Sequence, residues 1–282
     1  MVLASMIACL PAHAEQFAPY KDELFAYPGI IETAEGGSFR VVDYDEMRDI
    51  NARDEEPERR VQAKYVSLGV RKVQQELVAN TDAGQVRHVA VGKTEGASVI
   101  VVYMHGQGGD RRQGVNDFTF GGNFNRIKNM TVAAGGLYLS PDVASFDDAG
   151  AARIAALVAI YAARSPKAEI YLACGSMGGT ICWRLANDKT VAPRLGGLLL
   201  LGSLWDEKFL SSAAFKRKVP VFMGQGSRDK VFPAERVRAF YGLVRSRTKD
   251  YPIRMVVFES GSHGTPIRMT DWREVINWMA SR

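Results

Sequence analysis

Six short apolar runs constrain the fold of this chain more than any other feature. They are SVIVVYMHG (98–106), GLYLSPDV (136–143), EIYLACG (169–175), GGLLLLGSL (196–204), VPVFMGQG (219–226) and IRMVVFESG (253–261). Strands that are buried on both faces of a parallel sheet have unbroken apolar runs, whereas half-exposed strands alternate. Such strands, separated mostly by helical patterns, predict an α/β fold: a three-layer sandwich whose mostly parallel central sheet is flanked by helices.

The segments around these runs complete the predicted sandwich. Helices are expected at 147–165, 178–188, 232–247 and 270–282. Ahead of the apolar runs, residues 63–79 and 85–92 flank a turn at 82–84, which predicts an antiparallel pair of strands at the edge of the sheet. The gap at 205–218 has room for one short helix, so no large cap domain is expected.

Ser176 lies between glycines, where the strand at 169–175 turns into a helix. Ligands of open α/β sheets bind at the carboxyl ends of the strands, which is where this serine falls. A helix start supplies free N–H groups for a developing oxyanion, and a serine becomes a nucleophile when a base takes its proton. The alternative is a glycine-rich turn with an incidental serine. The phosphate-binding pattern G-x-x-x-x-G-K-[ST] is absent.

A base and an acid are predicted at the ends of later strands. His263 follows the last apolar run in ESGSHGTP, whereas His88 falls within a predicted edge strand, where a structural role is expected. Asp229 follows the run at 219–226 in GQGSRDKVFP, although a turn or helix-capping aspartate is the alternative. Glu259 is the rival acid, but it lies inside the last predicted strand.

These motifs resemble those of the α/β-hydrolase superfamily of serine esterases and lipases, over roughly residues 64–282. The matching motifs are HGQGG (105–109), CGSMGG (174–179), GSRDKVFP (226–233) and SGSHG (260–264), and they keep the family's order of nucleophile, acid and histidine. The resemblance implies an oxyanion hole formed by the N–H groups of Met177 and Gln107, with those of Gly106 or Gly108 as alternatives to Gln107. The family pattern G-x-S-x-G departs here at its first position, which is Cys174.

The resemblance implies hydrolysis of carboxylic esters through a covalent acyl-enzyme, with no metal or organic cofactor. The expected partner is a small-molecule ester or amide. A serine exopeptidase or acyltransferase with the same triad, and a non-catalytic ligand-binding member of the fold, remain as alternatives. Candidates for the substrate pocket are His105, Trp205, Phe232 and the loop 110–127. Arg111 and Arg112 favour anionic substrates or are ordinary surface charges.

Residues 1–14 contain no charged residue and end in Ala-His-Ala. This pattern predicts a Sec-type signal peptide cleaved after Ala14, which would remove His13 and place the protein in the periplasm or outside the cell. The segment is too short to span a membrane. Alternatives are a lipobox with Cys9 acylated, or an apolar first helix of a cytoplasmic protein. Residues 15–63 are expected to form an N-terminal extension, and 64–282 the catalytic domain.

The charges and the remaining cysteines complete the prediction. The net charge is +5, but the basic residues are scattered among acidic ones, which does not favour a nucleic-acid partner. Cys174 and Cys182 match no metal-binding pattern; their spacing neither supports nor excludes a disulfide, and small buried apolar side chains are expected. The sequence makes no prediction of the oligomeric state.

Overall fold

The computed structural model describes residues 15–282, so the predicted signal peptide and the alternative lipobox lie outside the described residues. A ten-stranded sheet in the order β1-β2-β12-β11-β10-β9-β7-β8-β6-β5 forms its centre. Its strands are β1 (Ile30–Ala34), β2 (Phe39–Val42), β5 (Gln74–Thr81), β6 (Gly84–Gly92), β7 (Val99–Met104), β8 (Leu137–Pro141), β9 (Glu169–Gly175), β10 (Leu195–Leu201), β11 (Val221–Gly226) and β12 (Ile253–Phe258). From β2 to β8 in this order all neighbours are parallel, and the pairs β1–β2, β8–β6 and β6–β5 are antiparallel. The predicted mostly parallel sheet is confirmed, and each apolar run forms a strand.

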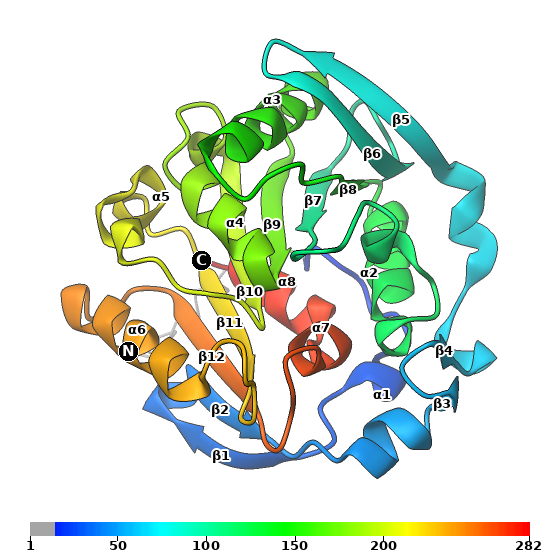
Figure 1. The fold of residues 1–282 in the computed structure, drawn as a ribbon, viewed down its shortest axis with the longest axis vertical. Helices are drawn as coiled ribbons and strands as arrows, with labels where there is room; N and C mark the ends of the chain where they lie inside the picture. Colours follow the sequence, from blue (N-terminus) through cyan, green and yellow to red (C-terminus); the bar gives the residue numbers. More distant parts are fainter. Residues whose placement is uncertain (1–14) are drawn as a thin grey trace, which may run out of the picture.

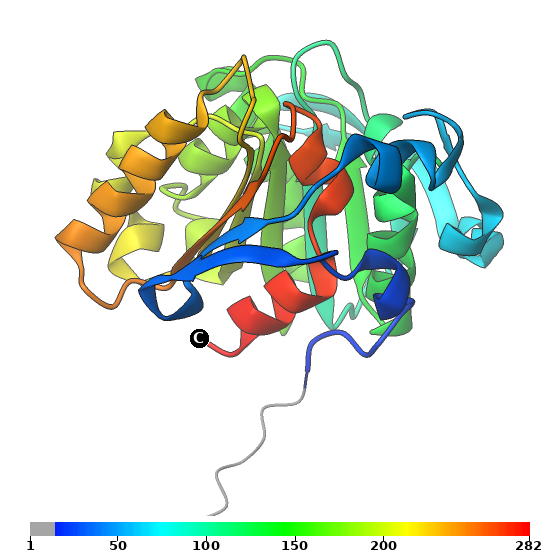
Figure 2. The same ribbon diagram turned by 90° about the horizontal axis from the view of Figure 1, so that it is seen from below.

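Helices cover both faces of this sheet, as Figures 1 and 2 show. The helices are α3 (Asp148–Arg164), α4 (Gly179–Leu185) and α6 (Ala234–Arg247) on one face, and α2 (Asn123–Ala133) and α8 (Trp272–Ala280) on the other. Along β7, Ile100 and Val102 belong to the first core while Val99 and Val101 belong to the second. Successive side chains of a strand point to opposite faces, so a strand covered on both sides is apolar throughout.

The predicted loop 110–127 is wrong in its last five residues, because α2 begins at Asn123. The periodicity of apolar residues does not predict this helix, because the helix buries charged side chains as well as apolar ones. Arg126 and Lys128 are fully buried. Arg126 pairs with Asp22 and Asp271, and Lys128 pairs with Asp117. Buried charges are tolerated when they are paired, so the stability of this helix depends on partners elsewhere in the chain.

The predicted edge hairpin is confirmed as β5–β6, but its first strand is shorter than expected. Residues 68–73 form 3-10 turns, and pairing begins at Gln74. At the opposite end of the sheet, residues 15–63 contribute two strands. β2 runs parallel to β12, and β1 forms the outer edge beside it (Figures 1 and 2). The N-terminal extension therefore continues the main sheet, while the boundary at residue 63 stays a prediction.

Between β10 and β11 the chain forms a 3-10 helix (Glu207–Ser211) and the short helix α5 (Ala213–Lys216). The predicted absence of a large cap domain is confirmed. No helix within residues 15–282 is long and apolar enough to cross a membrane.

Cys174 and Cys182 are fully buried, as predicted, but the expectation of separate apolar side chains is wrong. They form a disulfide, with their α-carbons 6.4 Å apart. The turn that follows β9 brings the first turn of α4 back against the end of the strand. The spacing of two cysteines alone does not reveal this geometry, which depends on the tightness of the turn.

Candidate active site

Ser176 is the first residue after β9, and its φ of 51° places it in the left-handed region. This conformation is strained for a non-glycine residue and turns the chain sharply from strand to helix. Gly178 permits the turn, because a Cβ there would lie 2.5 Å from the carbonyl oxygen of Met104. The Ser203 hydroxyl donates a hydrogen bond of 2.6 Å to the Ser176 carbonyl. The segment 174–178 departs from the pattern G-x-S-x-G only at Cys174, and the chain still turns sharply at Ser176.

His263 lies in the loop between β12 and the helix α7 (Thr265–Met269), and it joins the other two predicted residues. Its Nε2 is 2.9 Å from the hydroxyl oxygen of Ser176, and its Nδ1 is 2.8 Å from Oδ2 of Asp229. The carboxylate accepts a hydrogen bond from the N–H at Nδ1, and in this tautomer Nε2 is free to accept the serine proton. The three side chains thus form one continuous hydrogen-bonded chain, drawn from three loops at the carboxyl ends of β9, β11 and β12.

Asp229 is buried and held by several donors. Its Oδ1 accepts the N–H groups of Val231 and Phe232 at 2.7 and 3.0 Å, and its Oδ2 accepts Nε2 of Gln225 at 2.7 Å. Burial by itself raises the pKa of Asp229. The hydrogen bonds from His263 and from the two backbone amides outweigh it, so the pKa lies below its ordinary value. The carboxylate is therefore ionised and fixed in orientation.

The segment after β7 passes directly beside the serine. A Cβ on Gly106 would lie 2.7 Å from Cβ of Ser176, so only glycine fits here. The Gly106 carbonyl accepts hydrogen bonds from Nδ1 of His105 at 2.8 Å and from the Gly109 amide at 3.1 Å. A trans peptide points its N–H away from its carbonyl. The N–H of Gln107 therefore faces away from the His105 ring, and it donates to no acceptor within residues 15–282.

The remaining predicted pocket residues lie at different distances from this chain of hydrogen bonds. His105 is buried behind the glycine loop, and its Nε2 accepts the Val143 amide at 2.9 Å, so it supports the loop from behind. The ring of Phe232 contacts that of His263, with centroids 5.6 Å apart. Trp205 is half-buried and stacks against Arg236.

Several other predicted candidates lie outside the hydrogen-bonded chain. Glu259 was expected inside the last strand, which is wrong, because β12 ends at Phe258. It is exposed and makes no side-chain hydrogen bond within the described residues. Burial lowers the pKa of His88, whose ring contacts Tyr161 and the Val86 carbonyl. The expectation that His88 lies in an edge strand is wrong, because β6 is paired with both β5 and β8. Arg111 is paired with Glu76 and Asp142. An exposed pair joins Arg112 to Asp110.

Gln225 is the supporting residue that the sequence interpretation missed. Its Nε2 donates both to Asp229 and to the Phe232 carbonyl, and thereby fixes the turn that carries the acid. The signal was present, because a glutamine interrupts an otherwise apolar strand. Among residues 15–282, no group of three histidine, cysteine or acidic side chains is arranged to hold a metal ion.

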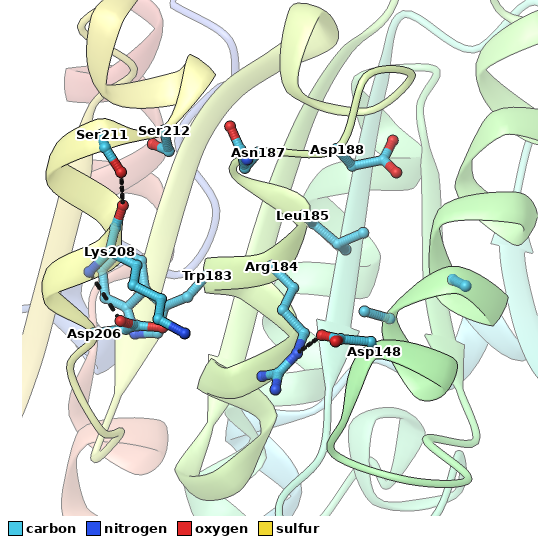
Figure 3. Close-up of a pocket in the computed structure, with 12 residues that line it drawn as sticks. Asp148, Trp183, Arg184, Leu185, Asn187, Asp188, Asp206, Lys208, Ser211 and Ser212 are labelled. Atoms are coloured by element: carbon cyan, nitrogen blue, oxygen red, sulfur yellow. Dashed lines mark hydrogen bonds and ion pairs between the residues drawn. The ribbon is translucent and has the colours of Figure 1, made fainter.

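A pocket lies elsewhere on the molecule, on the outer side of α4, and Figure 3 shows the residues that line it. Its volume is ≈ 530 Å³, and none of the three hydrogen-bonded residues lines it. Its polar groups are engaged with one another: Arg184 pairs with Asp148, and the Asp206 carboxylate caps the Lys208 amide (Figure 3). No histidine is among the residues that line this pocket.

Comparison with solved structures identifies the fold. The chain is similar to an α/β serine hydrolase homologue from Coxiella burnetii, with a TM-score of 0.53 and 19% identity over 72% of this chain and 95% of that one. An esterase of Pyrococcus furiosus has a TM-score of 0.55 and 14% identity, over 77% and 95% of the two chains. A lid-less α/β serine hydrolase from Xanthomonas campestris has a TM-score of 0.53 and 16% identity, over 74% and 94%. No protein-family model matches the sequence, and no curated protein matches it either. The sheet order, the two helical layers and these likenesses together establish that the chain has the α/β-hydrolase fold.

Proposed function

We propose that this protein is a serine hydrolase that cleaves carboxylic esters of small molecules. The observation that carries the proposal is the unbroken chain from the Ser176 hydroxyl through His263 to the Asp229 carboxylate, at 2.9 and 2.8 Å. The nucleophile is a hydroxyl beside a base, and the base is oriented by a buried acid, which is the arrangement that acyl transfer requires. The structural neighbours described as esterases and serine hydrolases support the same reaction class.

The chain's own residues carry out the reaction in two halves. His263 takes the proton of the Ser176 hydroxyl while the serine oxygen attacks the ester carbonyl, and the carbonyl oxygen becomes an oxyanion. The protonated imidazole, stabilised by Asp229, then gives its proton to the departing alcohol, and an acyl-serine remains. Water attacks this acyl group with His263 again as the base, and the carboxylic acid leaves. The site needs no cofactor for these steps.

The proposed oxyanion hole consists of the N–H groups of Gln107 and Met177. Met177 is in the first turn after the serine, where amides have no partner within the helix. The Gln107 amide is without a protein acceptor in the described chain. In other enzymes one such donor contributes about 3–4 kcal/mol to the stability of the transition state.

We also propose that the protein acts in the periplasm or outside the cell, after cleavage behind Ala14. The buried Cys174–Cys182 disulfide supports this proposal, because disulfides persist in oxidising compartments and are rare in the cytoplasm. Mass spectrometry of the protein from the periplasmic fraction tests it. A mature chain that begins at Glu15 supports the proposal, and an intact Met1 in the cytoplasmic fraction contradicts it.

The test of the activity is hydrolysis of p-nitrophenyl esters, from acetate to palmitate, by residues 15–282 and by Ser176→Ala. Activity should disappear in Ser176→Ala and persist in the control Ser211→Ala, whose serine is exposed and remote from the triad. Labelling by a fluorophosphonate should follow the same pattern. A parallel series of p-nitroanilides separates esterase from amidase activity. No hydrolysis and no labelling of the unaltered protein would contradict the proposal.

A further inference from the structure

The amino end of the sheet, opposite the triad, carries a cluster of basic side chains that we call the basic face. The strands β9, β10, β11 and β12 are parallel neighbours, so the segments that precede them lie side by side at this end. Figure 2 shows the last turn of α6 (orange), the turn between β1 and β2 (blue) and the C-terminus at this end, opposite the loop between β12 and α7. The basic face comprises six exposed side chains: Lys167, Lys216, Arg217, Lys218, Arg247 and Lys249.

The basic face has few compensating charges. In segments 165–169, 216–220 and 247–252, which contain it, only Glu169 and Asp250 are acidic. No salt bridge within the described residues involves any of the six basic side chains. The basic residues are far apart in the sequence, but the fold gathers them at one end of the sheet. This end therefore has a net positive charge.

The ends of helices account for only part of this cluster. Lys216 and Arg247 lie in the last turns of α5 and α6, where a cation interacts favourably with the free carbonyl groups. That interaction falls off within the last turn. Lys167, Lys218 and Lys249 lie beyond the helices, in the connections to the next strands. The stability of the helices therefore does not require these three lysines.

Lys218 occupies a position at which glycine is favoured. Its N–H donates to the Phe215 carbonyl at 3.0 Å, and the N–H of Val219 donates to the Ala214 carbonyl at 3.0 Å. This is the Schellman arrangement, and it ends α5 with Lys218 in the left-handed region, at a φ of 56°. A side chain in this region is strained relative to glycine. Strain that the surrounding structure maintains is concentrated at functional sites, and here it places a lysine on the basic face.

Two neighbouring cavities open at the basic face. Their volumes are ≈ 360 and ≈ 340 Å³, and both are lined by Asp250, Pro252 and Arg282. Lys249 lines the first cavity and Lys218 the second. Arg282 is left out of the basic face because it also carries the last carboxylate of this sequence. An anionic group that enters either cavity meets a lysine without an ion pair.

Arg254, which also lines the first cavity, is surrounded by other cations. The Glu274 carboxylate binds Arg254 at 2.8 Å and Arg40 at 3.3 Å, so one acid serves two guanidinium groups. Burial lowers the pKa of Arg254, Glu274 raises it, and the charges of Arg40 and Arg282 lower it again. An anion in this cavity would relieve the repulsion between the cations.

The chemistry of the basic face fits the phosphate groups of a lipid surface. Its cations are spread over the beginnings of several strands and do not converge on one cleft. The aromatic rings of the two cavities, Tyr251 and Trp278, are buried, whereas sites for single-stranded nucleic acid stack bases on exposed rings. None of the exposed large apolar side chains of residues 15–282 lies in the three segments of the basic face, so the contact would be with headgroups alone.

We propose that the basic face attaches the protein to the phosphate groups of an anionic lipid bilayer, with the triad directed away from the membrane. Each lysine or arginine near such a surface strengthens the association about fivefold. The attachment is electrostatic, so it weakens as the ionic strength rises. This inference does not depend on the proposed ester hydrolysis.

The test is sedimentation of residues 15–282 with vesicles, either of phosphatidylcholine alone or of equal parts of phosphatidylcholine and phosphatidylglycerol. We expect binding only to the vesicles with phosphatidylglycerol, and a loss of binding when sodium chloride is added. Lys218→Gln/Lys249→Gln should weaken this binding about 25-fold, at about fivefold for each charge. The matched control Arg228→Gln/Lys230→Gln removes the same charge from exposed positions that follow β11, at the opposite end, and should change binding by less than about twofold.

Two results with the vesicles would overturn the proposal. Equal binding to both kinds of vesicle would show no preference for anionic lipid. Equal weakening by the two double variants would show that net charge matters and the basic face does not. Binding of a duplex DNA fragment that is tighter than binding to the anionic vesicles, at the same ionic strength, would overturn the lipid assignment in favour of nucleic acid.

The variant Lys218→Gly separates a loss of binding from a loss of folding. It removes the charge and relieves the strained conformation, so the midpoint of thermal unfolding should stay equal or rise. Binding to the anionic vesicles should nevertheless weaken about fivefold. Unchanged binding by this variant, together with an equal or higher midpoint, would contradict the proposal.

Discussion

The disulfide between Cys174 and Cys182 joins β9, the strand before Ser176, to α4, the helix after it, and its removal should destabilise the protein measurably. The two cysteines are separated by 8 positions, and both are fully buried. The perturbation is the double variant Cys174→Ala/Cys182→Ala. Reduction of the unaltered protein by dithiothreitol under unfolding conditions is the comparison that changes no side-chain volume.

The expected magnitude follows from the length of the loop. Closing a loop of eight residues in the unfolded chain corresponds to about 2.5 kcal/mol of chain entropy. The alanine variant also loses two buried sulfur atoms, so its loss of stability should exceed that of the reduced protein. For a domain of this size about 1 kcal/mol shifts the midpoint of thermal unfolding by about 2–4 °C, which gives a decrease of about 5–10 °C.

Urea unfolding of residues 15–282, with and without dithiothreitol, measures the free energy of unfolding. Thiol titration in urea without reductant should find no free thiol, because these are the two cysteines beyond residue 14. Two free thiols, or equal stabilities in the oxidised and reduced states, would refute the reasoning. The single variants Cys174→Ala and Cys182→Ala should each unfold at about the same urea concentration as the reduced protein, and dithiothreitol should not change their free energy of unfolding.

The remaining predictions concern three variants, Asp229→Asn, His105→Ala and Asp54→Asn. Asp229→Asn should lower kcat by about 10⁴, because the imidazole loses its working tautomer. Since the folded pKa of Asp229 is lowered, its carboxylate stabilises the fold above the ordinary pKa near 4, and the unaltered protein should lose stability relative to Asp229→Asn as urea unfolding is repeated at lower pH. His105→Ala should lower kcat about 10–100-fold with little change in KM, because the peptide that carries the Gln107 amide loses a hydrogen bond; equal kcat values would contradict this role. Asp54→Asn should lower the free energy of unfolding in urea by about 3–5 kcal/mol, because it leaves Arg268 buried without its counterion, and a loss below 1 kcal/mol would contradict this.

Local patterns in the sequence predict much of the fold. The apolar runs become buried strands because a strand covered on both faces has no polar positions, and this is visible without knowledge of its neighbours. The turn at Ser176 is likewise local, since glycines, a serine and a following helix mark it directly. The proximity of Ser176, Asp229 and His263 could be predicted because parallel strands place their carboxyl ends at one edge of the sheet.

Tertiary structure decided the features that depend on distant partners. Residues 15–63 show no clear pattern because β2 is stabilised by pairing with β12, more than 200 positions away. The charged helix α2 is stable because Asp22, Asp117 and Asp271 neutralise its buried cations. The sequence by itself therefore determined the strands, the α/β class and the candidate triad, through local periodicity and turn chemistry. Only the folded chain decided the disulfide and the support of the glycine loop 106–109 by His105, because these depend on contacts that no local pattern encodes.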